Sequence, residues 1–431
     1  MRELSNTAWL REFQQKLHTK AKDEPKFRFY SLYDKTYRID VLTEAYRKAK
    51  ANGGACGVDG TTFADVEAKG VSEYLAGLQL EMQEHRYEPQ PVRRVYIPKA
   101  NGKKRPLGIP TIRDRVVQTA FQLILEPIFE ADFDDSSFGF RPEVSAHDAV
   151  SEIAKCLNWG CIDVYDVDLE QYFDTVDHGK LMKLVARRIS DAHILHVLKL
   201  WLSCGYVEDG QHRQSDRGTP QGGVISPLLA NIYLNPVDQA FKRSRLGALN
   251  NGSVHLVRYA DDMVILAKKN LEKGVDLLYH YTERLGLRLN AEKTRRVNVS
   301  IGNSVDFLGF RFHSVKNWKS GNRFIKVYPS PRSQQRFRDR VRKMIHHSIP
   351  LSVKEQVDNF NRFVLGWVAY YRLGHGSDVF RKLAHFVNLR VRHVIWRRKG
   401  KRGYGFTKLT AEHVYGQLGL FNSYHVAPLT R

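Results

Sequence analysis

The arrangement of apolar and polar positions predicts a β-hairpin that carries two adjacent acids at its tip. Val257 and residues 263–266 have the β-branched and apolar character of buried strands, and Asp261 and Asp262 lie between them. Like charges at the edge of a core repel each other and lose solvation, and a bound cation relieves both costs. Carboxylate oxygens suit Mg²⁺ or Mn²⁺. A pair of adjacent acids by itself is more often a solvated turn, so the rest of the chain decides between the two interpretations.

A second acidic segment covers residues 161–178 and also predicts a strand that ends in a turn. The apolar residues Ile162, Val164, Val167 and Leu169 fit a strand, and Asp163, Asp166 and Asp168 lie on or near it. Several acids on a buried strand are hard to explain by packing alone. Because Asp168 lies far before Asp261 along the chain, a shared site requires the fold to bring the two segments together.

A basic hairpin is predicted near residue 100. Residues 92–97 alternate as a strand, and Asn101-Gly102 is a hairpin signal. The basic residues that line the hairpin are Lys99, Lys103, Lys104 and Arg105. Such a hairpin suits a triphosphate or a nucleic-acid backbone, and a solvated charged turn is an equal alternative.

Amphipathic helices are predicted over residues 71–87, 113–129 and 271–286, and a further apolar helix follows Ser226. Two glycines before Ser226, at 222 and 223, allow backbone to approach a ligand closely. Residues 306–312 predict one short strand with a glycine bend.

The segment from 316 to 402 is helical and strongly basic. It contains 22 Lys and Arg against 4 Asp and Glu, which is most of the formal net charge of +22. Apolar residues recur there at three- and four-residue spacing, which predicts two or three helices with an apolar seam and basic outer faces. So many positive charges in one segment repel each other and destabilise the fold unless a polyanion binds them.

Composition narrows the class of protein. The 431 residues are enough for two or three domains, and 42% hydrophobic content excludes wholesale disorder. No apolar run reaches the length of a membrane span and no secretion signal opens the chain, so a soluble intracellular protein is expected. The four cysteines form no C-x₂-C pair, which argues against a zinc site and a disulfide framework.

Several motifs, taken in order, resemble those of reverse transcriptases encoded by bacterial group II introns. The motifs are IPKANGKKRPLGIPT, SFGFRP, DVDLEQYFDTVDH, RGTPQGGVISPLLANIYL, RYADD, GLRLNAEKT and DFLGFRF. The ANGGACGVDG stretch resembles the N-terminal extension of that family, and FNRFVLGWVAYYR resembles its maturase (X) domain. The resemblance covers nearly the whole chain.

The resemblance implies an α+β fold of the right-hand polymerase type, with fingers, a palm that contains an antiparallel sheet, and a helical thumb. It places Asp168, Asp261 and Asp262 together on the palm as catalytic residues that hold two Mg²⁺ ions, with Mn²⁺ as a substitute. The Leu169 carbonyl is a further candidate ligand. Two metal ions suit phosphoryl transfer, because they neutralise a triphosphate and activate the primer 3′-OH.

Other roles follow from the same motifs. Lys99 and Arg105 match the fingers residues that hold the triphosphate, and Gln221 matches a contact to the nascent base pair. Phe173 lies where a bulky ring excludes a ribose 2′-OH, with core packing as its alternative. Lys293 is a candidate proton donor to the leaving pyrophosphate.

The expected domains are an N-terminal extension over 1–75, fingers and palm over 76–315, a thumb and maturase X domain over 316–402, and a C-terminal segment over 403–431 that is a candidate remnant of a DNA-binding region. Arg141, beside two aromatic residues, is expected either to hold a phosphate or base or to be structural. The candidate nucleic-acid-binding residues are Arg141, Arg362, Arg372, Arg390, Arg397 and Arg398.

The expected function is RNA-directed DNA synthesis combined with binding of the intron RNA to assist splicing and mobility. The implied partners are group II intron RNA, an RNA template with a DNA primer, dNTPs and target DNA, with no membrane. Many family members carry an endonuclease with paired cysteines, and no cysteine follows Cys204, so a compact, endonuclease-lacking (group IIC-like) bacterial cytoplasmic protein is expected. The alternatives are a splicing maturase without polymerase activity and a domesticated reverse transcriptase in DNA repair or phage defence. Sequence alone does not identify the cognate intron or the oligomeric state.

Overall fold

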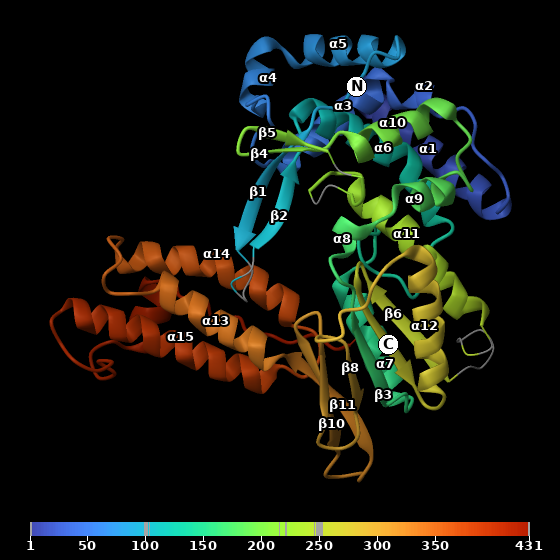
Figure 1. The fold of residues 1–431 in the computed structure, drawn as a ribbon. Coiled ribbons are helices and arrows are strands. Elements are labelled where there is room, and N and C mark those ends of the chain that lie inside the picture. The colour runs from blue at the N-terminus through green and yellow to red at the C-terminus, as the bar shows by residue number, and fades with distance from the viewer. Residues whose placement is uncertain are drawn as a thin grey trace.

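The structure is a computed structural model, and it describes residues 2–98, 102, 104–214, 216–219, 222–244, 246 and 253–429, with side chains from residue 8. Figure 1 shows an N-terminal helical region at the top, a central sheet region below it, and a bundle of helices that extends to one side. The N-terminal helices are α1 (Arg2–Asp23), α2 (Tyr33–Thr36), α3 (Ile39–Asn52), α4 (Phe63–Lys69) and α5 (Val71–Gln83).

The predicted basic hairpin is present as two antiparallel strands. Strand β1 (Val92–Pro98) pairs with β2 (Lys104–Ile109), and the last pair before the turn is Pro98 with Lys104. Strand β4 (Tyr206–Glu208) adds to β1 in parallel and β5 (Gln211–Arg213) pairs with β4, so the sheet order is β2-β1-β4-β5. The hairpin points down between the N-terminal region and the helical bundle (Figure 1).

The central sheet has the strand order β6-β7-β3-β8, and all its neighbours are antiparallel. Its strands are β3 (Asp163–Asp168), β6 (Val254–Tyr259), β7 (Asp262–Ala267) and β8 (Arg295–Asn298). Successive side chains of a strand point to opposite faces. On β7, Met263 and Ile265 therefore join one buried core, and Val264 and Leu266 join another.

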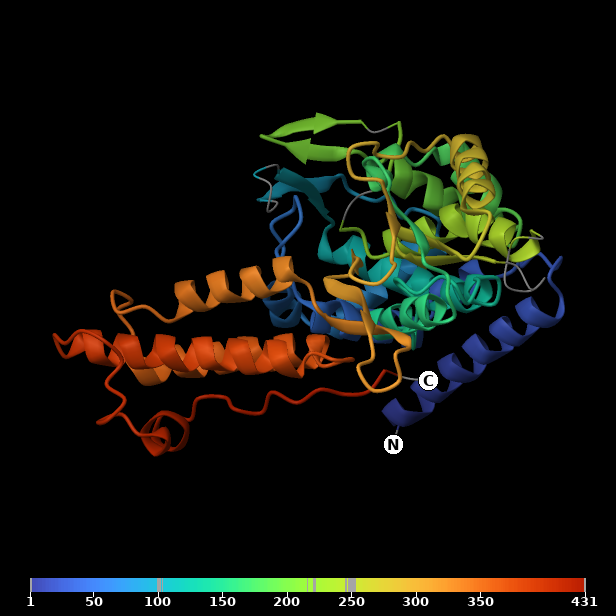
Figure 2. The same cartoon turned by 90° about the horizontal axis from the view of Figure 1, so that it is seen from below.

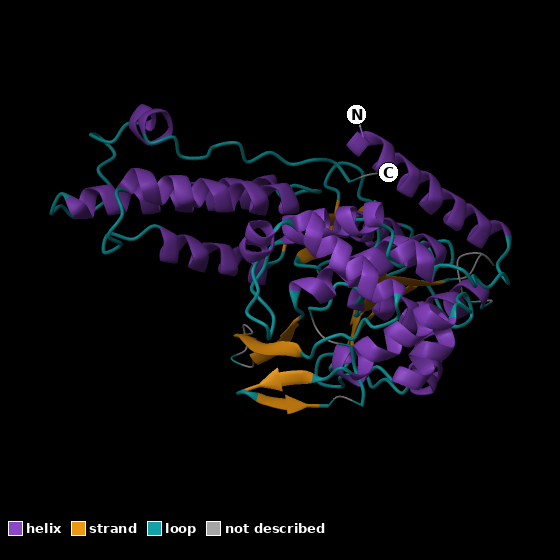
Figure 3. Ribbon diagram, turned by 90° about the horizontal axis from the view of Figure 1, so that it is seen from above, coloured by secondary structure: helices purple, strands orange, loops and turns teal. Residues whose placement is uncertain are grey.

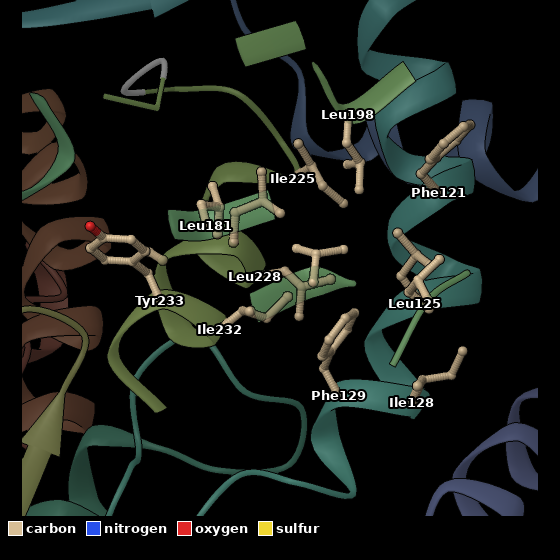
Figure 4. Close-up of a cluster of buried hydrophobic side chains, with 14 of the residues drawn as sticks. Phe121, Leu125, Ile128, Phe129, Leu181, Leu198, Ile225, Leu228, Ile232 and Tyr233 are labelled. Atoms are coloured by element: carbon tan, nitrogen blue, oxygen red, sulfur yellow. The ribbon is translucent and has the colours of Figure 1, made fainter. Parts of the chain in front are cut away.

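Helices cover both faces of this sheet. Helices α11 (Ser226–Arg243) and α12 (Leu271–Leu285) contribute to the first core, and α7 (Ala146–Asn158) contributes to the second. The first core continues into α6 (Ile112–Glu130), α9 (His178–Val185) and α10 (Ala192–Ser203). Figure 4 shows Phe129 of α6 beside Leu228 and Ile232 of α11. A short helix, α8 (Tyr172–Thr175), follows β3.

The segment 306–312 differs from its prediction of one bent strand. It contains the end of β9 (Ser304–Phe307) and the start of β10 (Phe310–Lys316), which form a tight hairpin. Leu308 and Gly309 make its two-residue turn with φ values of 48° and 82°, as the right-handed twist of paired strands favours. Strand β11 (Arg323–Pro329) completes this antiparallel sheet. The predicted boundary between 315 and 316 lies inside the β10–β11 hairpin, so the structure favours a boundary near Ser330.

Three helices follow, as the apolar spacing predicts: α13 (Pro331–Met344), α14 (Val353–Tyr371) and α15 (Ser377–Arg398). Their seam includes Phe337, Phe360 and Phe380, each at most 1% exposed. Figure 2 shows the C-terminal segment returning along this bundle toward the body of the molecule. The segment contains a π-helical turn, η2 (Glu412–Gln417), and Ala427 pairs with Leu373. Figure 3 shows that the strands lie in the body, whereas the bundle is helical.

Candidate active site

The fold brings the three predicted catalytic acids together. Strands β3 and β7 are neighbours, and their register places Asp168 directly opposite Asp262. Tyr259 pairs with Asp262 across the β6–β7 hairpin, so Ala260 and Asp261 form its two-residue turn. Directly opposite residues of an antiparallel pair have Cβ atoms about 4.5–5.5 Å apart. The carboxylates of Asp168 and Asp262 therefore share one end of the sheet with Asp261.

The charges of these acids are poorly compensated. Burial raises the pKa of Asp262 to about 6, and repulsion by Asp261 and then by Asp168 adds to the shift. Burial also raises the pKa of Asp261, with a further contribution from Asp168. Arg105 opposes the rise at Asp261 and Lys293 opposes it at Asp262. A site with excess negative charge of this kind favours a cation.

Lys293 lies inside this acidic cluster. Its Nζ is 2.7 Å from Oδ2 of Asp168, and more than half of the lysine side chain is exposed. The backbone of the same segment is fixed to the end of β3, because the Asn290 amide donates to the Asp168 carbonyl at 2.8 Å. Leu169 is bridged to Leu289. The segment that carries Lys293 thus forms one wall of the site.

The acids fit a divalent ion by their chemistry. They supply hard oxygen donors. Burial, and then repulsion between the acids, raises the pKa of Asp261 and Asp262, and a bound cation would offset both costs. Within the part of the chain that the structure describes, however, no three His, Cys, Asp or Glu side chains converge as a ready metal site. At Asp168 the ammonium of Lys293 supplies the positive charge instead.

The structure describes only some of the predicted nucleotide-binding residues. Arg105 on β2 is exposed and acts electrostatically on Asp261, so the basic hairpin faces the acids. Phe173 is half-buried on α8, where it packs edge-to-face against Tyr172 and Phe140. Its carbonyl accepts a hydrogen bond of 2.7 Å from the amide of Thr219. Lys99 and Gln221 lie outside the described residues.

Two predicted contacts to a ligand are internal to the protein. The guanidinium of Arg141 pairs with Glu130 and donates to the carbonyls of Asp134 and Ser137, both at 2.6 Å. This arrangement favours the structural alternative for Arg141. A Cβ at Gly222 would lie 2.4 Å from the Gly108 carbonyl oxygen. The close approach that Gly222 permits is therefore to strand β2, not to a ligand.

The arginines of the bundle fall into two groups. Arg390 is half-buried and donates to the Ile345 carbonyl at 2.9 Å, which is a structural contact. Arg362, Arg372, Arg397 and Arg398 are exposed. Arg398 also donates to the carbonyls of His347 at 3.3 Å and Ile349 at 2.7 Å, and Arg362 donates to Asn359. All four keep charged surface open to a polyanion.

Sequence reasoning missed a buried polar group directly behind the acids. Arg258 of β6 and Asp238 of α11 form an ion pair in which both side chains are fully buried, with Nη2 and Oδ2 2.6 Å apart. The available signal was an arginine that directly follows the apolar residues Leu256 and Val257 of a predicted buried strand. A charge at such a position requires a partner.

Comparison with known proteins agrees with this geometry. Residues 97–312, which include all three acids, match the family model described as reverse transcriptase (RNA-dependent DNA polymerase). The chain belongs to the reverse transcriptase family. Residues 334–409 match the group II intron maturase-specific domain. The protein is thus an RNA-directed DNA polymerase joined to a maturase domain, and families of this kind use divalent metal ions.

Individual relatives of this reverse transcriptase support the same assignment. Protein YkfC of Escherichia coli (strain K12) is 37% identical over 359 residues, which cover 75% of this chain and 93% of YkfC. The group II intron-encoded protein LtrA of Lactococcus lactis subsp. cremoris is 40% identical over 213 residues, or 49% of this chain and 35% of LtrA. An uncharacterized 91 kDa protein in the cob intron of Schizosaccharomyces pombe is 26% identical over 420 residues, which cover 81% of this chain and 51% of that protein.

No helix among the described residues of this reverse transcriptase is both long enough and apolar enough to cross a membrane.

Proposed function

We propose that this reverse transcriptase extends a DNA primer on an RNA template at a site made by Asp168, Asp261 and Asp262, with Mg²⁺ as its natural metal. The observation that supports the proposal most is the strand register that pairs Asp168 with Asp262 beside the turn residue Asp261. When bound, two such ions would neutralise the triphosphate and activate the primer 3′-OH. Asp168, Asp261 and Asp262 would hold these ions, with the Leu169 carbonyl as a further ligand.

The remaining polar residues of the site have proposed roles that suit their positions. Arg105 projects from the basic hairpin toward Asp261, where a guanidinium fits the triphosphate of a dNTP. The Nζ of Lys293 lies 2.7 Å from Asp168 and its side chain is more than half exposed. From this position its ammonium would donate a proton to the leaving pyrophosphate. Lys99 and Gln221 complete this proposed dNTP site.

Replacement of Phe173 by Ala is expected to increase ribonucleotide incorporation by roughly 10-fold or more, since a lost steric contact is worth about 1–3 kcal/mol. The ring is half-buried beside the site and keeps a face toward solvent. Primer extension with matched dNTP and rNTP concentrations measures the ratio, with Tyr172→Phe as the control because Tyr172 is the buried neighbour on α8. An unchanged sugar preference in Phe173→Ala would assign the ring to packing alone.

The raised pKa of Asp262 predicts a pH-dependent metal requirement. A carboxylate must lose its proton to bind a metal ion, so the apparent affinity for Mg²⁺ is expected to fall about 10-fold per pH unit below the pKa of about 6. Extension rates measured from pH 7 to pH 5 at low Mg²⁺ should therefore decline, and high Mg²⁺ should restore them. A decline that high Mg²⁺ does not restore would contradict the assignment.

The same shift has an opposite effect on the metal-free protein. The pKa of Asp262 is raised from 3.8 to about 6 in the folded chain, so the folded state binds more protons than the unfolded state between these values. The stability contribution of this group therefore falls as pH rises from about 4 to about 6. Thermal unfolding in a chelator, compared between the wild type and Asp262→Asn, isolates this contribution.

We further propose that the helical bundle and its C-terminal segment bind the group II intron RNA and assist its splicing, in a bacterial cytoplasm, with target DNA as a later partner. The proposed division is an N-terminal extension over 1–75, fingers and palm up to about 330, and a thumb and maturase domain after that. Primer extension on an RNA template, run beside splicing of the cognate intron, tests both activities. Splicing assistance without any extension by the wild type would favour a maturase that has lost its polymerase.

A further inference from the structure

A network of buried hydrogen bonds lies directly behind the turn that carries Asp261. Arg258 is the penultimate residue of β6 and comes two residues before Ala260. Its guanidinium donates from Nε and Nη2 to both carboxylate oxygens of Asp238 on α11, at distances between 2.6 and 3.1 Å. Both side chains are fully buried. The pair is therefore shielded from solvent and held in one orientation.

The remaining donor of Arg258 reaches the catalytic turn itself. Its Nη1 donates to the Ala260 carbonyl at 3.0 Å and to Oδ1 of Asn231 at 2.9 Å. Asn231, also fully buried on α11, donates in turn from Nδ2 to the Gly139 carbonyl at 2.8 Å. One guanidinium thus joins α11 and the turn directly, and through Asn231 it also reaches the loop at residues 136–140.

That loop holds the turn from the other side. The Phe138 amide donates to the Arg258 carbonyl, and the Arg258 amide donates to the Ser136 carbonyl, both at 2.8 Å. Gly139 packs against the turn so closely that a Cβ there would lie 2.3 Å from the Ala260 nitrogen. The turn is therefore clamped between the loop and the Arg258 side chain.

The clamped turn has a backbone conformation that needs support. Ala260 has φ of 57°, in the left-handed region that residues with a Cβ adopt at a cost. Such conformations persist where surrounding contacts determine them, and they gather at functional sites. The conformation of Ala260 sets the direction in which the next residue, Asp261, projects.

We propose that Arg258 is a positioning residue for the polymerase reaction, which holds the Ala260 carbonyl so that Asp261 points into the metal site. A buried ion pair is weak evidence for stability, because apolar residues of similar volume often serve a core as well. A role in positioning Asp261 explains why the Arg258–Asp238 ion pair lies against the catalytic turn. Asp238 and Asn231 orient the guanidinium, and the loop at 136–140 presses the turn against it.

The test compares Arg258→Lys with Arg188→Lys. A lysine at 258 keeps a cation beside Asp238 but lacks the planar fork that reaches the carboxylate, Asn231 and Ala260 together. Arg188 is a matched control, because it is a buried arginine whose Nε lies 3.0 Å from Asp132 and which donates to the Glu24 carbonyl at 3.0 Å.

We expect Arg258→Lys to lower kcat by roughly 100-fold, as misplacement of a reacting group by about 1 Å does, with unchanged affinity for the RNA template and DNA primer. Its affinity for Mn²⁺, measured without substrate from the loss of the free-ion EPR signal, should fall at least several-fold. Arg188→Lys should lower the melting temperature and leave kcat and Mn²⁺ affinity at wild-type values. Gly139→Ala, which moves the turn from the opposite side, should reproduce the loss of kcat.

An Arg258→Lys protein that melts earlier but keeps wild-type kcat and Mn²⁺ affinity would overturn the proposal and leave the pair a purely structural role. Loss of template–primer affinity in parallel with kcat would overturn it as well, because that result indicates general damage to the palm. The inference rests on the proposed polymerase function. If the wild type itself fails to extend primers, that function is rejected, and the Mn²⁺ comparison still decides whether Arg258 positions the acids.

Discussion

Replacement of Asp261 by Asn is expected to reduce primer extension on an RNA template by about 1000-fold or more. Metal ions contribute several kcal/mol of transition-state stabilisation in such reactions, and each 1.36 kcal/mol is a factor of ten in rate. Asn keeps the size of the side chain and removes the charge that holds the ion. Single-turnover extension at saturating dNTP measures the chemical step, and a filter-binding assay measures affinity for template and primer, which should be unchanged.

Asp163→Asn is the matched control for this experiment. Asp163 lies on the same strand as Asp168, at its opposite end, and accepts a hydrogen bond of 2.6 Å from Asn298. The Asp163→Asn variant should extend primers at a rate within about 2-fold of the wild type, because surface substitutions generally have small effects. Splicing assistance should survive Asp261→Asn, since the bundle that carries the excess positive charge is intact. Extension by Asp261→Asn at more than a tenth of the wild-type rate would reject the assignment of the site.

The parts of the site that sequence predicts well are those set by local patterns. The β6–β7 hairpin follows from apolar and β-branched residues on either side of a short turn, and the structure confirms it with Ala260 and Asp261 in that turn. Helices α6 and α12 begin and end close to their predicted limits for the same reason, whereas α5 begins as predicted and ends at Gln83, before the predicted limit of 87. The order of the motifs then gave the family, and with it the convergence of Asp168 with the hairpin, which no local pattern contains.

The parts that sequence reasoning missed depend on contacts between distant segments. For Arg141 the sequence left a ligand contact and a structural role open, and the pairing with Glu130, which α6 and the loop bring together, favours the structural role. Strand β11 was also missed, although Phe324, Ile325, Val327 and Tyr328 favour a strand, and its partner β10 is set by the fold. The pairing of Arg258 with Asp238 requires α11 to pack on the sheet. Neither local propensity nor spacing encodes these partners.

The exposure of the bundle arginines separates the candidates for RNA contact from those whose charge is used within the fold. Arg392 is buried and donates to Asn388 at 2.7 Å, so its charge is used within the fold, like that of Arg390. The exposed arginines of the predicted set are Arg362, Arg372, Arg397 and Arg398. They lie on α14, at the residue that ends it, and on the last turn of α15. The number of these arginines determines how strongly RNA binding is expected to depend on salt.

Substitution of these four arginines by Gln is expected to weaken binding of structured intron RNA by on the order of 100-fold at low salt. Each phosphate contact contributes about 0.7–0.9 to the slope of log K against log salt, so the slope should fall by about 3. Binding measured across a salt series gives both quantities. The matched control replaces Lys16, Arg47, Lys50 and Arg86, each already paired with a glutamate, and removes the same total charge. If both variants reduce the slope equally, the effect comes from net charge, and the bundle is not the RNA-binding surface.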